Sequence, residues 1–128
     1  GAFVPVEVTG DSTPELAVAL GQLPCPAGAF RGPAGGTVQF WSTAARAPRL
    51  ILEQQMHGFS PRGGLLVTLQ HGGACGAASI ARCLVTYRWD AGKRLMLAAA
   101  RAPVAEAEGL AAITFDQDLR RVAGATAQ

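Results

Sequence analysis

Residues 83–90, which read CLVTYRWD, form the stretch that decides the fold. In an extended chain, successive side chains point to opposite sides, so every second residue lies on the same side. One side then carries Cys83, Val85, Tyr87 and Trp89. The other side carries Leu84, Thr86, Arg88 and Asp90. A period of two with one apolar side is typical of a strand that buries one face.

A turn and a returning strand follow this stretch. Residues 91–93 read AGK and have the small and polar composition of a turn. Residues 94–100 are expected to return as a strand, with Leu95 and Leu97 on the core side. The sequence therefore predicts an antiparallel hairpin over residues 83–100.

Further strands are predicted toward the N-terminus. They cover residues 37–42 (TVQFWS), 49–57 (RLILEQQMH) and 65–71 (LLVTLQH). Residues 59–64 (FSPRGG) are expected to form a turn, which would make the last two strands an antiparallel hairpin. A short strand is expected over residues 3–8, at a sheet edge because Pro5 has no N–H to donate.

Short helices are predicted near both ends of the chain. Residues 12–15 read STPE, a capping box, and predict a helix of about two turns that ends at Gly21. Residues 116–123 predict a terminal helix, because acids come first and arginines last. We expect a loop over residues 21–36, a linker over residues 104–110 and a strand over residues 111–115.

Together these elements indicate a mainly β fold, with α+β as the variant if the helices form. We expect an antiparallel β sandwich or small barrel with one or two short terminal helices, since strands recur at roughly ten-residue spacing. The 128 residues suit a single domain, 1–128. Its parts would be an N-terminal strand, helix and loop (1–36), an antiparallel sheet (37–100) and a C-terminal segment (101–128).

Composition excludes several classes of function. A net charge of +2 with 16% charged residues lacks the basic excess of a nucleic-acid binder. No apolar run approaches the roughly 20 residues that a membrane span needs. The chain is 49% hydrophobic, more than so small a domain can bury, so part of a sheet face should remain for a partner or a second copy. We therefore expect a protein partner or self-association, with a homo-oligomer as the common form.

The three cysteines favour an oxidising compartment. Cys75 and Cys83 are eight residues apart and are expected to form a disulfide. The alternatives are that Cys25, set between two prolines, pairs with one of them, or that all three are reduced and buried. The chain also begins without Met, so we expect an extracytoplasmic protein, periplasmic or secreted. No C-x-x-C or H-x-x-x-H spacing occurs, and no metal or cofactor is expected.

Candidate partner-binding residues are those that a sheet face or turn would expose. Trp41 is opposite in phase to Phe40, so one of these two rings should point outward. The full set of candidates is Trp41, Pro61, Arg62 and Trp89.

These features predict a non-catalytic, extracytoplasmic protein-binding module, such as a periplasmic inhibitor or an immunity-type protein that acts by steric occlusion. A first alternative is a homo-oligomeric structural or adhesive β domain of the fibre-head, capsid or adhesin type. A second is a small-ligand carrier or small enzyme that uses Cys75 as nucleophile and His71 as base. A catalytic role is disfavoured because no Asp or Glu lies near either histidine in the sequence to orient it.

Overall fold

The computed structural model describes residues 3–10, 13–20, 31–32, 35–44, 46–62, 64–76, 82–104 and 120–121. The strands are β1 (Phe3–Val6), β2 (Glu15–Ala19), β3 (Arg31–Gly32), β4 (Gly35–Ser42), β5 (Arg49–Met56), β6 (Gly58–Arg62), β7 (Leu65–His71), β8 (Arg82–Asp90), β9 (Leu95–Val104) and β10 (Arg120–Arg121). A 3₁₀ helix, η2 (Gly72–Cys75), follows β7.

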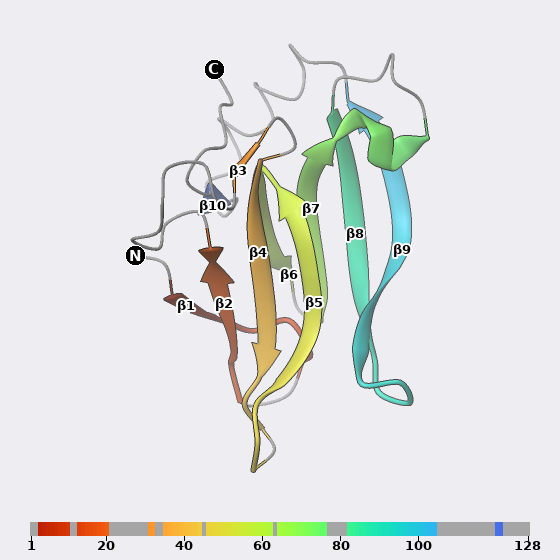
Figure 1. The fold of residues 1–128 in the computed structure, drawn as a ribbon. Coiled ribbons are helices and arrows are strands. Elements are labelled where there is room, and N and C mark those ends of the chain that lie inside the picture. Colours follow the sequence, from red (N-terminus) through yellow and green to blue (C-terminus); the bar gives the residue numbers. More distant parts are fainter. Residues whose placement is uncertain are drawn as a thin grey trace.

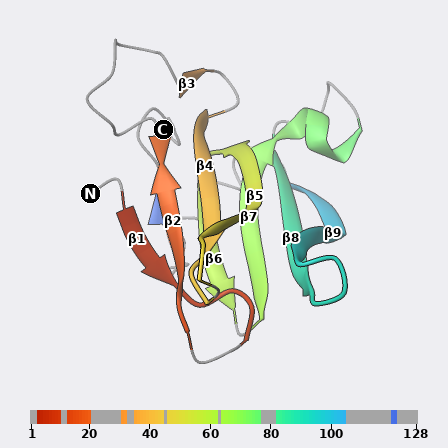
Figure 2. The same cartoon turned by 60° about the horizontal axis from the view of Figure 1, so that its bottom comes forward.

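The strands form two antiparallel sheets that pack as a β sandwich (Figure 1). Sheet A holds β1, β2 and β4 in that order, and both β3 and β5 also pair with β4. Sheet B has the order β10-β6-β7-β8-β9. The turned view shows η2 at one end of the sandwich, where it contacts β8 and β9 (Figure 2). The mainly β fold predicted from the sequence is thus confirmed.

The core lies between the sheets and is filled by alternate side chains of both. Phe40 on β4 and Phe59 on β6 meet edge to face, with ring centroids 5.1 Å apart. Both rings are buried, so this contact joins sheet A to sheet B. On β8, the predicted inward side is confirmed, since Cys83, Val85 and Tyr87 belong to the buried core.

The helix predicted after the capping box is wrong. This segment forms strand β2, which pairs with β1 on one side and β4 on the other. Two neighbouring strands satisfy its backbone groups and bury Ala17 and Ala19, and this tertiary pairing outweighs the local helix signal. Glu15 still bonds backwards, as in a capping box, because its carboxylate accepts N–H groups of Val8 and Thr9.

The hairpin predicted between residues 49–57 and 65–71 is also wrong. Strand β5 pairs with β4, and the predicted turn contains strand β6, which pairs with β7. The chain changes sheets at His57, so β5 and β7 end up in different layers. The tight turn is shorter than expected and includes Gly64 at φ +86°, a conformation that favours glycine.

The returning strand β9 has the opposite phase to the prediction. Met96 is 4% exposed and lies in the core, whereas Leu95 is 37% exposed. The turn spans four residues, 91–94, rather than three, and Met96 pairs with Trp89. One extra turn residue reverses which side chains face inward, because side chains alternate along a strand.

The ends of the chain differ from the prediction where they are described. Arg120 and Arg121 pair with β6 as strand β10, so the predicted helix over residues 116–123 is wrong at these positions. Val104, the first residue of the predicted linker, belongs to β9 instead, and the rest of that linker lies outside the described residues. The predicted loop over residues 21–36 contains β3 and the start of β4. The strand predicted over residues 111–115 and the thiol of Cys25 lie outside the described residues.

Candidate protein-binding face

The outer side of sheet A carries a row of apolar side chains around Trp41. In the strand register, Leu16 on β2 lies opposite Trp41 on β4, and Trp41 lies opposite Leu50 on β5. Pro5 on β1 extends the row because it pairs with Leu16. These side chains alternate with buried core residues of the same strands, which places them on the outer side.

Phe3 lies beside this row and is the most exposed large apolar side chain among the described residues, at 60%. The other four are half-buried or exposed. We call these five residues the Trp41 face: Phe3, Pro5, Leu16, Trp41 and Leu50. The face crosses four strands, so its residues are held by a sheet rather than by a loop.

A β-bulge explains how Leu50 joins the face. The register of β4 with β5 shifts between Phe40 and Trp41, so Phe40 pairs with Leu52 while Trp41 pairs with Leu50. Both Ile51 and Leu52 then pack on the core. Bulges re-aim side chains in this way. Without the bulge, simple alternation would place Leu50 and Leu52 on the same side.

Hydrogen bonds hold the indole of Trp41 in one orientation. Its Nε1–H donates to Oε1 of Gln39 at 3.1 Å, and Nε2 of Gln39 donates to the Glu53 carboxylate at 2.6 Å. A ring already held in one orientation loses less conformational entropy on binding. Gln39 and Glu53 also give the apolar face a polar border, the arrangement found at protein interfaces.

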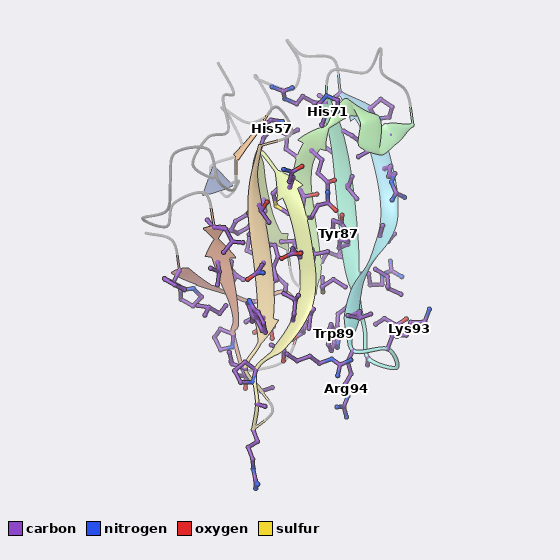
Figure 3. The ribbon with its side chains drawn as sticks, viewed as in Figure 1. His57, His71, Tyr87, Trp89, Lys93 and Arg94 are labelled. Carbon is purple, nitrogen blue, oxygen red and sulfur yellow. A yellow bond between two sulfur atoms is a disulfide. The ribbon has the colours of Figure 1, made fainter. Side chains whose placement is uncertain are left out.

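The structure separates the four sequence-predicted candidates. Trp41 lies on sheet A, whereas Pro61, Arg62 and Trp89 lie on strands of sheet B. Trp89 packs against the core and sits near the β8–β9 turn with Lys93 and Arg94 (Figure 3). Pro61 is half-buried on β6. Sequence reasoning missed Phe3, Pro5, Leu16 and Leu50, because only strand pairing brings them beside Trp41.

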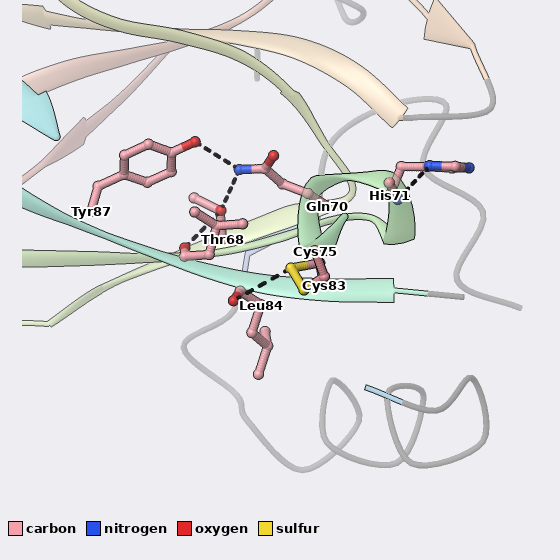
Figure 4. Close-up of a disulfide and its surroundings, with 9 residues drawn as sticks. Thr68, Gln70, His71, Cys75, Cys83, Leu84 and Tyr87 are labelled. Carbon is pink, nitrogen blue, oxygen red and sulfur yellow. Dashed lines mark hydrogen bonds between the residues drawn. A yellow bond between two sulfur atoms is a disulfide. The ribbon is translucent and has the colours of Figure 1, made fainter. Parts of the chain in front are cut away.

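Cys75 and Cys83 form a disulfide, as the sequence predicts, with Cα atoms 5.6 Å apart (Figure 4). Cys75 ends η2, and Gly76 follows as its C-cap at φ +93°, a conformation that favours glycine. A disulfide-bonded sulfur has no thiolate, so Cys75 offers no nucleophile in this form. Nδ1 of His71 accepts the N–H of Gly73 at 3.1 Å, which leaves only Nε2 of this exposed ring for other contacts.

Loss of this disulfide should lower stability by about 2–3 kcal/mol, because it closes a short loop in the unfolded chain. We expect Cys75→Ala with Cys83→Ala to unfold at lower urea concentration than the wild type. Reductant should lower the midpoint of the wild type and leave that of the double variant unchanged. A wild-type midpoint that does not respond to reductant would show that the bond contributes nothing to stability.

The described residues include no cluster of three or more His, Cys, Asp or Glu side chains placed to hold a metal ion. Nor does that part of the chain contain a helix with the length and apolar character needed to cross a membrane. Comparison with protein-family models, with curated proteins and with solved structures finds no match to this chain. The fold and the Trp41 face together define a small β sandwich with an apolar patch on the outer side of sheet A.

Proposed function

We propose that this chain is a non-catalytic protein-binding module that docks through the Trp41 face and acts by steric occlusion, as an inhibitor or immunity-type protein does. The observation that supports this most is the apolar row across four strands with its indole held by Gln39. Binding energy at protein interfaces concentrates in such aromatic anchors. A rigid sheet surface can block a partner's cleft without any reacting group.

The proposed compartment is extracytoplasmic. The Cys75–Cys83 disulfide supports this, since such bonds persist in oxidising environments and are rare in the cytosol. A second copy of the chain is the alternative occupant of the Trp41 face. Binding of that copy would make the protein a homo-oligomer of structural or adhesive type.

Cross-linking from the face tests the proposal. A photoreactive phenylalanine analogue at position 3 replaces an exposed ring with a similar one, and irradiation in the native compartment should give an adduct with one partner protein. Trp41→Ala should weaken binding at least about 30-fold, the loss of a single interface anchor. Leu95→Ala is the matched control, because Leu95 is the other exposed large apolar residue within the described ranges and lies on sheet B.

Three outcomes separate the alternatives. An adduct with a different protein, lost on Trp41→Ala and kept on Leu95→Ala, supports the proposed module. An adduct between two copies of the chain supports the homo-oligomer instead. No adduct at any concentration, or equal adducts in both variants, contradicts binding through the Trp41 face.

A further inference from the structure

His57 is the single residue between β5 of sheet A and β6 of sheet B. Its backbone N–H donates to the carbonyl of Leu69 on β7 at 2.7 Å, which fixes the crossover to sheet B. Its side chain is only 3% exposed. The point where the chain changes layers therefore holds an ionisable group away from water.

The imidazole of His57 lacks the contacts that usually accompany burial. Neither ring nitrogen has a hydrogen-bond partner among the residues that the structure describes. The nearby amide of Gln70 is different, because its Nε2 donates to Thr68 Oγ1 at 2.8 Å and to the Tyr87 hydroxyl at 2.9 Å (Figure 4). Thr68 in turn donates to the carbonyl of Val85. Hydrogen bonds thus link Thr68, Gln70 and Tyr87 to one another, and the His57 imidazole takes no part in them.

Among the described residues, the side chains whose charge acts on the His57 imidazole are those of Arg82 and His71, and both are basic. His71 at the end of β7 and Arg82 at the start of β8 lie directly opposite each other in the register. His57 and His71 lie at the same end of the sandwich (Figure 3). Burial first, then the charges of Arg82 and His71, lower the pKa of His57 to about 4. Among the residues that the structure describes, no acceptor compensates a proton on this ring.

We propose that His57 is an acid-sensitive latch at the β5–β6 crossover, whose protonation loosens the attachment of the two sheets at this end of the sandwich. The neutral ring is compatible with the closed crossover, whereas the imidazolium needs water or an acceptor. This inference is independent of the Trp41 face. It assigns the protein a response to acid and concerns no binding partner.

The direction of the pH effect follows from proton binding. The unfolded chain takes up a proton at the ordinary histidine pKa near 6.5, whereas the folded chain does so only near 4. Between these values the unfolded state binds more protons, so stability falls as the pH is lowered from about 6.5 to about 4 and changes no further through His57 below that. From pH 7 to pH 4.5, His57 alone should raise the unfolding equilibrium constant roughly 50-fold.

Urea unfolding of the wild type and of His57→Leu at both pH values measures this contribution. Acidic groups affect the stability of both proteins alike. The unfolding constant of the wild type should therefore rise roughly 50-fold more between pH 7 and pH 4.5 than that of His57→Leu, and this excess is the contribution of His57. His71→Gln is the control, because it alters an exposed histidine, and it should keep most of the excess. Equal pH dependence in the wild type and His57→Leu would overturn the proposal.

Two further readouts work on the wild type, even if His57→Leu fails to fold. The chain has only two histidines, so ring signals in NMR are assigned with His71→Gln alone. We expect the chemical shifts of the His57 ring to remain those of a neutral imidazole down to at least pH 5. We also expect exchange of the His57 and Gly58 amides, corrected for intrinsic rate, to accelerate below pH 6 more than exchange of the Val85 amide. A His57 pKa near 6.5, or uniform exchange across the three amides, would contradict the latch.

Discussion

Replacing Phe40 with alanine should lower the free energy of unfolding by about 3–5 kcal/mol. Phe40 is completely buried on β4, and its ring packs edge to face on Phe59 of the opposite sheet. Truncation removes this contact and leaves a cavity between the layers, which close-packed neighbours refill only in part. The expected loss is large because this one ring of sheet A also packs against sheet B.

Urea denaturation followed by circular dichroism measures this loss. Phe3→Ala is the matched control, since it removes the same ring from a position that is 60% exposed, and it should change stability by no more than about 0.5 kcal/mol. Comparable losses in the two variants would mean that Phe40 does not lie between the sheets.

Replacing Glu15 with alanine should cost about 3 kcal/mol. Glu15 is 1% exposed, and one carboxylate oxygen accepts the N–H groups of Val8 at 3.0 Å and Thr9 at 3.2 Å. The other oxygen accepts the hydroxyl of Thr9 at 3.0 Å. Alanine would leave the buried N–H of Val8 without an acceptor in the β1–β2 connection, and an unpaired buried donor is costly.

Glu15→Gln separates the hydrogen bonds from the charge. Its amide oxygen can accept the same two N–H groups, and its NH₂ can donate to Thr9. Burial raises the pKa of the Glu15 carboxyl above its ordinary value. The part of its contribution that depends on the bound proton is therefore present at low pH and is lost as pH rises through the folded pKa, whereas the hydrogen bonds to Val8 and Thr9 remain. We therefore expect Glu15→Gln to be at least as stable as the wild type at pH 8. The relative advantage of Glu15→Gln should shrink at pH 4.

Glu7→Ala is the surface control, because Glu7 accepts the exposed N–H of Gly10 beside the same turn. It should cost well under half of the loss expected for Glu15→Ala. If Glu15→Ala were as stable as the wild type, the carboxylate would not hold the β1–β2 connection in place.

The strands that the sequence predicts best are those with a regular alternation and a single buried side. Residues 83–90 and 37–42 are of this kind, and β8 and β4 contain them. Segment 14–20 misled the prediction because its capping signal is local, whereas pairing with β1 and β4 comes from distant residues. The partner of β5 was misassigned because sequence proximity favoured β7. Residues 58–62 pair with β7 instead and place Phe59 in sheet B, where its ring meets Phe40 of sheet A.

The candidate site was visible in the sequence only at its centre. The opposite phase of Phe40 and Trp41 showed that one ring faces outward, and the structure places Phe40 in the core. Leu16 was hidden by the predicted helix, and Leu50 reaches the face only through a bulge that no local pattern specifies. Residues that meet through strand pairing cannot be grouped before the pairing is known.

The yield of the position-3 cross-link in Trp41→Ala, relative to the wild type, tests the role of the Trp41 face most directly. Stability should remain close to that of the wild type because the indole is half-buried outside the core. We predict that the folded variant loses the adduct at wild-type working concentrations. A folded Trp41→Ala protein that captures the same partner with undiminished yield would contradict the assignment of this surface to binding.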